Sequence, residues 1–217
     1  GFSDTGFGGS TVARTPHLDA LAREAVHLTH FRAPVWCAPS RASFLTGRHG
    51  WEVGLAAAHG WTVLGSDTVL LSELLRELSY HTAIVGKFHF NPGLRNAHPS
   101  GGPFGCGFDQ QYGFIGGMTD YYEHHDSWSR DGVRLRERGY ATELFAAEAA
   151  RIIRQHAAAR PLRPLFLWLS LNAPHTPMQA PEAAVARYPA SYPPETRKYL
   201  AMVEAMDSAF GVAVAAL

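Results

Sequence analysis

Cys37 opens the segment whose residue types are best suited to chemistry. Residues 37–47 read CAPSRASFLTG, a pattern that predicts a short helix closed by glycine. Backbone N–H groups at the start of a helix favour negative charge, and so does the guanidinium of Arg41. The segment therefore predicts an anion site beside a cysteine sulfur. For an isolated cysteine, the alternative interpretation is a buried structural thiol.

Lys87 and His89 follow the first of two expected strands. Residues 81–86 (HTAIVG) are β-prone and mostly apolar, which predicts a buried strand ending at glycine. If the strand geometry continues, Lys87 and His89 point the same way and bring a cation and a titratable imidazole to one place. Taken alone, such a pair is more often a solvated surface pair.

His175 follows the second expected strand. Residues 164–171 (PLFLWLSL) form a continuous apolar run, which is typical of a strand covered on both faces. Residues 172–177 (NAPHTP) then place a proline on each side of His175 and restrict its backbone. Alone it would be a turn histidine. Because chemistry in open α/β sheets gathers where strands end, the polar residues after the two expected strands matter most: Lys87 and His89 after one and His175 after the other.

Helical periodicity surrounds these strands. Apolar residues recur at helical spacing in residues 15–28, 68–78 and 141–158. Thr15 is the expected N-cap of the first helix, and Ser66 or Asp67 that of the second. Helices that alternate with strands predict an α/β fold with a parallel sheet between helix layers.

Residues 91–131 are rich in Gly, Pro, Tyr and His, and we interpret them as long surface loops. Within them His124, His125 and Asp126 could be drawn as a metal site. Adjacent histidines in such a loop are more often exposed, and we favour that interpretation.

The composition limits the classes of partner. The 217 residues are 46% hydrophobic, enough for one sizeable core. Nineteen basic and nineteen acidic residues cancel, so no global field recruits nucleic acid or an anionic membrane surface. The apolar runs reach about eight residues, short of the roughly 20 that span a bilayer. Cys37 and Cys106 form no disulfide framework, although one bridge between them stays open, and they do not indicate a compartment.

Taken together and in this order, the segments around Cys37, Lys87 and His175 resemble the type I, formylglycine-dependent sulfatases. Residues 86–90 (GKFHF) are similar to the Gly-Lys-Trp-His-Leu element of that family, and residues 172–177 to its Pro-His-x-Pro element. Further similar stretches lie at both ends of the chain, at residues 15–22 and 199–207, and we interpret these as structural.

Three more stretches are most like the arylsulfatase B, or N-acetylgalactosamine-4-sulfatase, branch. They are residues 107–109 (GFD), residues 121–122 (YY) and residues 164–167 (PLFL) followed by His175. The resemblance implies an alkaline-phosphatase-like sandwich, an α/β fold with a mixed, mostly parallel sheet between helix layers, incomplete at both ends. It makes residues 1–217 a partial N-terminal catalytic sulfatase domain.

The resemblance also implies roles for the five site residues. Cys37 is converted by a formylglycine-generating enzyme into formylglycine (3-oxoalanine), the catalytic nucleophile. Arg41 and His89 act with it in catalysis, and Lys87 and His175 bind the substrate sulfate.

Family members hold one Ca²⁺ ion, and formylglycine at position 37 is one of its ligands. The other ligands are an aspartate pair expected before residue 1 and an Asp-Asn pair expected after residue 217. On this expectation residues 1–217 alone are inactive.

The expected reaction is hydrolysis of a sulfate ester, carried on a small molecule or a sulfated sugar. One alternative is a phosphatase or phosphonate hydrolase of the same superfamily, and another is a non-catalytic relative that binds sulfated glycans. Neither nucleic acid nor a membrane span is expected. The resemblance alone favours an exported protein, whether periplasmic, secreted or lysosomal.

Overall fold

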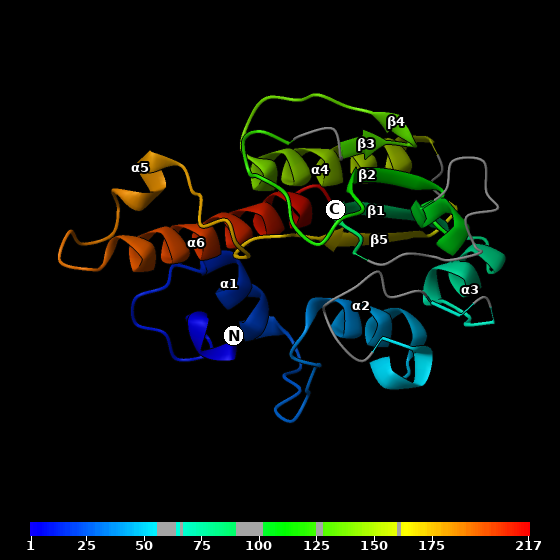
Figure 1. Cartoon of the computed structure of the whole chain (residues 1–217), viewed down its shortest axis with the longest axis horizontal. Coiled ribbons are helices and arrows are strands. Elements are labelled where there is room, and N and C mark those ends of the chain that lie inside the picture. The colour runs from blue at the N-terminus through cyan, green and yellow to red at the C-terminus, as the bar shows by residue number, and fades with distance from the viewer. Residues whose placement is uncertain (56–63, 66, 90–101, 125–127, 160–161) are drawn as a thin grey trace.

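The computed structural model describes residues 1–55, 64–65, 67–89, 102–124, 128–159 and 162–217 (Figure 1). In chain order the elements are η1 (Phe2–Asp4), α1 (Pro16–Glu24), α2 (Cys37–Thr46), η2 (Gly50–Val53), α3 (Leu71–Glu77), β1 (His81–Lys87), η4 (Gly102–Cys106), β2 (Gln110–Phe114), β3 (Trp128–Arg130), β4 (Val133–Arg134), α4 (Ala141–Ala159), β5 (Leu165–Ser170), α5 (Glu182–Val185) and α6 (Pro194–Val214).

The strands form one mixed sheet in the order β4-β3-β2-β1-β5. β1 lies at the centre of its parallel part and pairs with β2 on one side and β5 on the other. β3 and β4 extend the sheet in the antiparallel sense. The two strands expected from the sequence, β1 and β5, are therefore confirmed as neighbouring parallel strands, and their carboxyl ends meet at one edge.

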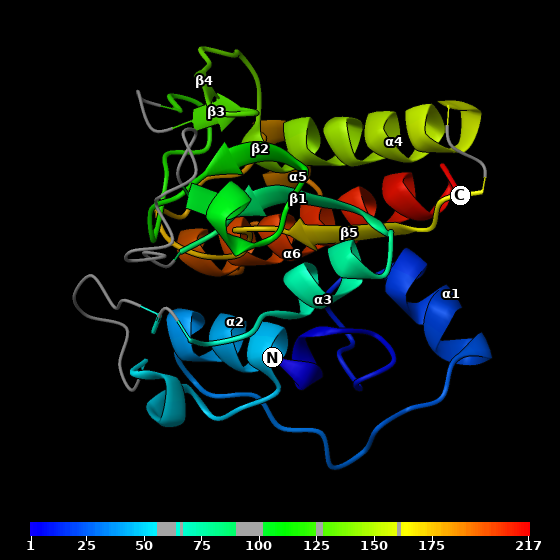
Figure 2. The same cartoon turned by 90° about the vertical axis from the view of Figure 1, so that its right-hand side faces the viewer.

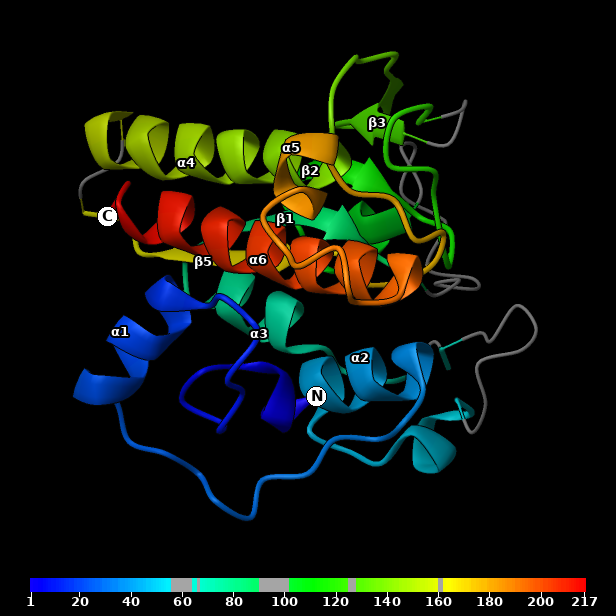
Figure 3. The same ribbon diagram turned by 90° about the vertical axis from the view of Figure 1, so that its left-hand side faces the viewer.

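The helices form a layer on each face of the sheet. Figures 2 and 3 show α4 and α6 together on one face and α2 and α3 on the other. Ala83 and Val85 of β1 pack in one apolar cluster with Phe145 of α4 and Met202 of α6. Ile84 lies between them in the sequence and packs in a second cluster on the α2 side. This alternation follows from the two-residue period of a strand and confirms the sandwich.

The interpretation of residues 91–131 as surface loops is wrong where β2 and β3 lie. Tyr112 and Phe114 are almost fully buried in the core. Gly113 between them pairs with Gly86 of β1, and a β-carbon on Gly113 would lie 2.2 Å from the Gly86 carbonyl oxygen. The glycine suggested a loop, but its place in the strand reflects this close backbone approach. Residues 91–101 and 125–127, including His125 and Asp126, lie outside the described residues.

The expected helices form, with different ends. α1 ends at Glu24, earlier than expected, and α4 runs almost as expected. α3 begins at Leu71 with Leu70 as its N-cap, so Asp67 is not the cap, and Ser66 lies outside the described residues. The Glu73 carboxylate accepts a hydrogen bond from the Leu70 N–H at 2.9 Å and thereby caps α3 from within.

Asp207 ties the two ends of the chain together. Its fully buried carboxylate on α6 accepts hydrogen bonds from the backbone N–H groups of His17 (3.1 Å) and Leu18 (2.8 Å) in the first turn of α1. An acidic group at a helix N-terminus satisfies donors that have no partner within the helix. This contact supports the structural interpretation of the similar stretches at both ends.

Two expectations from the composition can be compared with the structure. Both cysteines are free, so no bridge joins them. Among the described residues, no helix combines the length and the apolar character needed to cross a membrane.

Candidate active site

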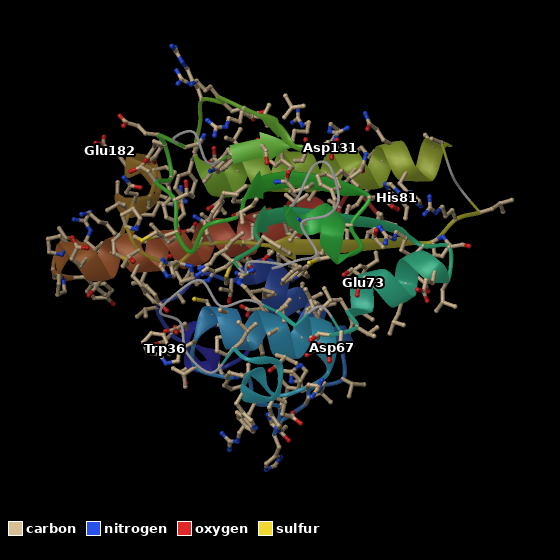
Figure 4. The ribbon with its side chains drawn as sticks, turned by 45° about the vertical axis from the view of Figure 1, so that its right-hand side comes forward. Trp36, Asp67, Glu73, His81, Asp131 and Glu182 are labelled. Atoms are coloured by element: carbon tan, nitrogen blue, oxygen red, sulfur yellow. The ribbon has the colours of Figure 1, made fainter. Side chains whose placement is uncertain are left out.

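The candidate site lies where α2 begins and where β1 and β5 end. Figure 4 marks Trp36, the N-cap residue of α2, and Cys37 is the first residue of that helix. β1 ends at Lys87 and β5 at Ser170. Side chains from three elements thus converge at the carboxyl edge of the parallel strands, where ligands of α/β proteins usually bind.

Arg41, one turn into α2, reaches across to both strands. Its Nη1 donates hydrogen bonds to the backbone carbonyl of Lys87, at 2.6 Å, and to the hydroxyl of Ser170. The guanidinium also lies over the ring of Trp168, with Cζ 5.6 Å from the centroid. Burial lowers the Arg41 pKa to about 10, and the nearby Cys37 side chain partly offsets this effect. The guanidinium is therefore still charged at neutral pH and is held by the protein.

Lys87 brings a second, almost fully buried cation to Cys37. The pKa of Lys87 is lowered to about 8, mainly by burial and secondly by repulsion from Arg41. The Cys37 side chain acts in the opposite direction, because it attracts the ammonium group and forms a hydrogen bond with it. Lys87 thus lies beside position 37 together with Arg41.

His89 reaches the same place by a different route from the one expected. Its φ of 61° lies in the left-handed region, so the strand geometry does not continue beyond Lys87 and that premise was wrong. The His89 N–H instead donates to the carbonyl of Ile115 at 3.0 Å. The pKa of its imidazole is lowered to about 4. Burial is the largest cause, and repulsion from Lys87, Arg41 and His175 adds to it. His89 is therefore neutral at pH 7, with a buried Nδ1 that has no partner within the described part of the chain.

His175 lies on the turn after β5 and its side chain is exposed. Its N–H donates to the carbonyl of Asn172 at 2.8 Å, and its Nδ1 lies 2.7 Å from the carbonyl oxygen of Thr176. The Tyr121 hydroxyl donates to the His175 carbonyl at 2.9 Å. These contacts hold the turn beside the site, close enough for His175 to affect the pKa of His89.

The structure thus brings all five residues expected from the sequence into one neighbourhood: Cys37, Arg41, Lys87, His89 and His175. Two side chains that are cationic at neutral pH, Arg41 and Lys87, lie beside position 37, and two imidazoles lie close to them. Such a site attracts an anion and can stabilise negative charge that develops during a reaction.

Two other side chains differ from the expectation. Ser170 belongs to the site but was not singled out, although a lone hydroxyl that ends an apolar strand is a usable signal. His124 is buried, not exposed, and stacks on Trp128 with the ring centroids 4.1 Å apart. Its ring nitrogens lie within hydrogen-bond distance of the Tyr121 and Glu137 carbonyls, which makes it a core histidine.

The side chains around Cys37 do not fit a calcium site by themselves. A calcium ion takes six to eight oxygen ligands, several of them anionic. The neighbours of Cys37 named above are cationic or imidazole groups, and the described residues contain no group of three His, Cys, Asp or Glu side chains that could hold a metal ion. The expectation of calcium therefore rests on the resemblance alone.

The mixed α/β sheet thus carries a cationic site at the carboxyl ends of its parallel strands, where ligands of α/β proteins usually bind. The family model described as Sulfatase matches residues 1–217. The chain belongs to the sulfatase family.

Individual relatives agree with this assignment. Arylsulfatase J of Mus musculus is 32% identical over 225 residues, covering 96% of this chain and 36% of the mouse protein. An arylsulfatase of Klebsiella aerogenes is 28% identical, covering 88% of this chain and 44% of that protein. The crystal structure of Ps i-CgsB in complex with k-i-k-neocarrahexaose aligns over 100% of this chain and 52% of that chain, at 28% identity and a TM-score of 0.83.

These comparisons confirm the sulfatase fold, while the arylsulfatase B branch stays a prediction. The chain spans about half or less of the length of the relatives and the solved structure it matches.

Proposed function

We propose that the protein hydrolyses sulfate esters, with position 37 as the nucleophile. The observation that carries this proposal is the convergence of Arg41 and buried Lys87 on the side chain that begins α2. Two fixed cations beside a nucleophile fit the three charged oxygens of a sulfuryl group. Membership of the sulfatase family supports the same reaction.

In the proposed reaction, a formylglycine-generating enzyme first oxidises Cys37 to formylglycine. Hydration of the aldehyde gives two hydroxyl groups on one carbon. One hydroxyl oxygen attacks the sulfur and forms a new S–O bond, the ester S–O bond breaks, and the alcohol leaves with the displaced proton. The second hydroxyl then loses its proton, the carbonyl reforms, and the C–O bond breaks to release sulfate. Water restores the hydrate.

The side chains of this chain have distinct parts in these steps. Arg41, Lys87 and His175 contact the sulfuryl oxygens and offset their charge. His89 is neutral above about pH 4, so its imidazole can accept the proton of the second hydroxyl. A base that is already neutral at pH 7 requires no prior loss of a proton.

A sulfated sugar is the substrate class we favour. Ps i-CgsB, which has the same fold, is described in complex with k-i-k-neocarrahexaose. A simple aryl sulfate tests the chemistry without assuming the sugar. By the same family resemblance, we propose an exported location.

The experiment is a paired assay of the full-length protein co-expressed with a formylglycine-generating enzyme. We expect p-nitrophenyl sulfate to be turned over much faster than p-nitrophenyl phosphate, and Cys37→Ala to abolish turnover. A preference for phosphate would support the phosphatase alternative instead. Binding of a sulfated glycan with no turnover of either ester would support the non-catalytic alternative.

A further inference from the structure

Ser170 links the Arg41 guanidinium to the backbone of Lys87 through one hydroxyl group. Its Oγ accepts a hydrogen bond from Nη1 of Arg41 and donates one to the carbonyl oxygen of Lys87 at 2.7 Å. That carbonyl also accepts from Arg41 at 2.6 Å, so the three groups form a closed triangle. Ser170 is only 5% exposed, and water therefore cannot easily replace its hydroxyl.

The backbone of the two strands brings Ser170 to this position. Ser170 pairs with Gly86 in the parallel register between β5 and β1. Gly86 has a φ of +111°, and a β-carbon there would lie 2.2 Å from the Ser170 carbonyl oxygen. Only glycine permits this approach, which places the Ser170 side chain beside the next carbonyl of β1, that of Lys87.

The triangle offsets the cost of a partly buried charge. The Arg41 guanidinium is only partly exposed, and burying a charge costs free energy unless the charge finds hydrogen-bond partners. Two oxygen acceptors on the same guanidinium nitrogen offset this cost and fix the orientation of Arg41 over Trp168. Without the hydroxyl, Arg41 keeps one of these acceptors and the Lys87 carbonyl keeps one of its donors.

We propose that Ser170 is a positioning residue that holds the Arg41 guanidinium against the backbone carbonyl of Lys87, and that this contact directs the guanidinium toward the sulfuryl group. The role of Arg41 in turnover rests on the proposed function. The geometric part, that Ser170 fixes the guanidinium, does not.

Ser170→Ala tests the catalytic part in the full-length, formylglycine-containing protein. We expect kcat for an aryl sulfate to fall about tenfold, as loss of one charge-assisted hydrogen bond typically gives. KM should change less than kcat, because the guanidinium remains present but is no longer held in one orientation. Ser170→Thr, which keeps the hydroxyl, should restore much of kcat.

Ser43→Ala is the matched control. Ser43 lies on the same helix as Arg41, and its buried hydroxyl has no partner within the described residues. Its removal should change neither kcat nor KM. If Ser170→Ala lowers stability but leaves kcat at the wild-type value, Ser170 is only a packing residue and the proposal is wrong.

A second measurement is independent of activity. In the unconverted protein, NMR of the Arg41 Nη–H groups measures how firmly the guanidinium is held, with and without Ser170→Ala. Faster rotation of the guanidinium in the variant supports the positioning role even if no sulfate ester is hydrolysed, and unchanged rotation overturns it. Failure of the proposed function would instead appear as absent turnover in the wild-type protein.

Discussion

Lys87 and His175 lie in the same candidate site but differ in burial. Lys87 is 2% exposed and contacts Cys37, whereas His175 is exposed on a turn fixed by its backbone contacts. A buried charge attracts an anion more strongly because its surroundings have a low dielectric constant. An exposed imidazole can contact the substrate as it enters the site. We therefore propose that the two residues supply different kinds of contact to the same anion.

Replacing either Lys87 or His175 by alanine should lower kcat/KM for an aryl sulfate by about a hundredfold or more, because each change removes one preorganised contact to the sulfuryl oxygens. Steady-state kinetics of the full-length protein measure the effect. Arg154→Ala, at an exposed position on α4, is the control and should behave as wild type. A wild-type rate from either site variant would remove that residue from the site.

The pKa values of Lys87 and His89 predict the pH range of activity. The Lys87 ammonium, with its pKa of about 8, is present below pH 8 and lost above it, so kcat/KM should fall on the alkaline side. The His89 imidazole, with its pKa of about 4, loses its ability to accept a proton below pH 4 and sets the acid side. Lys87→Arg should move the alkaline limb upward, since a guanidinium stays charged. An alkaline limb that is unchanged in Lys87→Arg would exclude Lys87 as its origin.

At the residue scale, the sequence predicted which side chains meet but not how His89 reaches the others. Residue type and order along the chain were enough to select Cys37, Lys87 and His175. The left-handed turn at His89 depends on its backbone bond to Ile115, a contact between segments that no local pattern specifies.

At the scale of elements, the segment after β2 shapes the space for His89. A β-carbon on Gly117 would lie 2.5 Å from Nε2 of His89, so an alanine there must displace the imidazole. The neighbouring Gly116 has more room, because its nearest contact would be the Met118 carbonyl oxygen at 3.7 Å. Two adjacent glycines thus differ in their expected effect on the site.

Gly117→Ala should reduce kcat and shift the acid limb of the pH profile, with a small effect on stability, whereas Gly116→Ala should leave both kinetic quantities unchanged. Kinetics across the pH range, together with thermal unfolding, separate these outcomes. Equal behaviour of the two variants would show that His89 is not confined by Gly117.

The elements themselves could be predicted where apolar periodicity was strong. β1, β5 and α4 follow from their sequences because each carries its own pattern over several residues. β2 could not be identified, since its five residues include Gly113, whose place depends on the approach of Gly86. The N-cap of α3 was also missed, because Leu70 has no capping side chain and its N–H is bonded by the carboxylate of Glu73 within the helix.

At the scale of the whole molecule, zero net charge coexists with a strongly cationic site. The attraction for an anion is therefore local and arises from buried groups, which salt screens less than surface charges. β5 lies at one end of the sheet order among the described strands.

We expect residues 1–217 expressed alone to show no turnover of an aryl sulfate, with or without added calcium. The described residues offer no set of carboxylates for the ion that the family resemblance implies, and Arg41 and Lys87 cannot supply oxygen ligands. The assay compares this chain with the full-length protein at equal concentration. Calcium-dependent turnover near the full-length rate would show that the metal ligands lie within residues 1–217.

The mass of the tryptic peptide that spans residues 33–41 tests the formation of the nucleophile most directly. The peptide contains Cys37, Pro39 and Arg41, and the second cysteine, Cys106, lies in a different peptide of the same digest and serves as an internal control. After co-expression with a formylglycine-generating enzyme, we predict the aldehyde at position 37 and an unmodified thiol at Cys106. An unmodified thiol at Cys37, under conditions that convert a known sulfatase, would contradict the proposed mechanism.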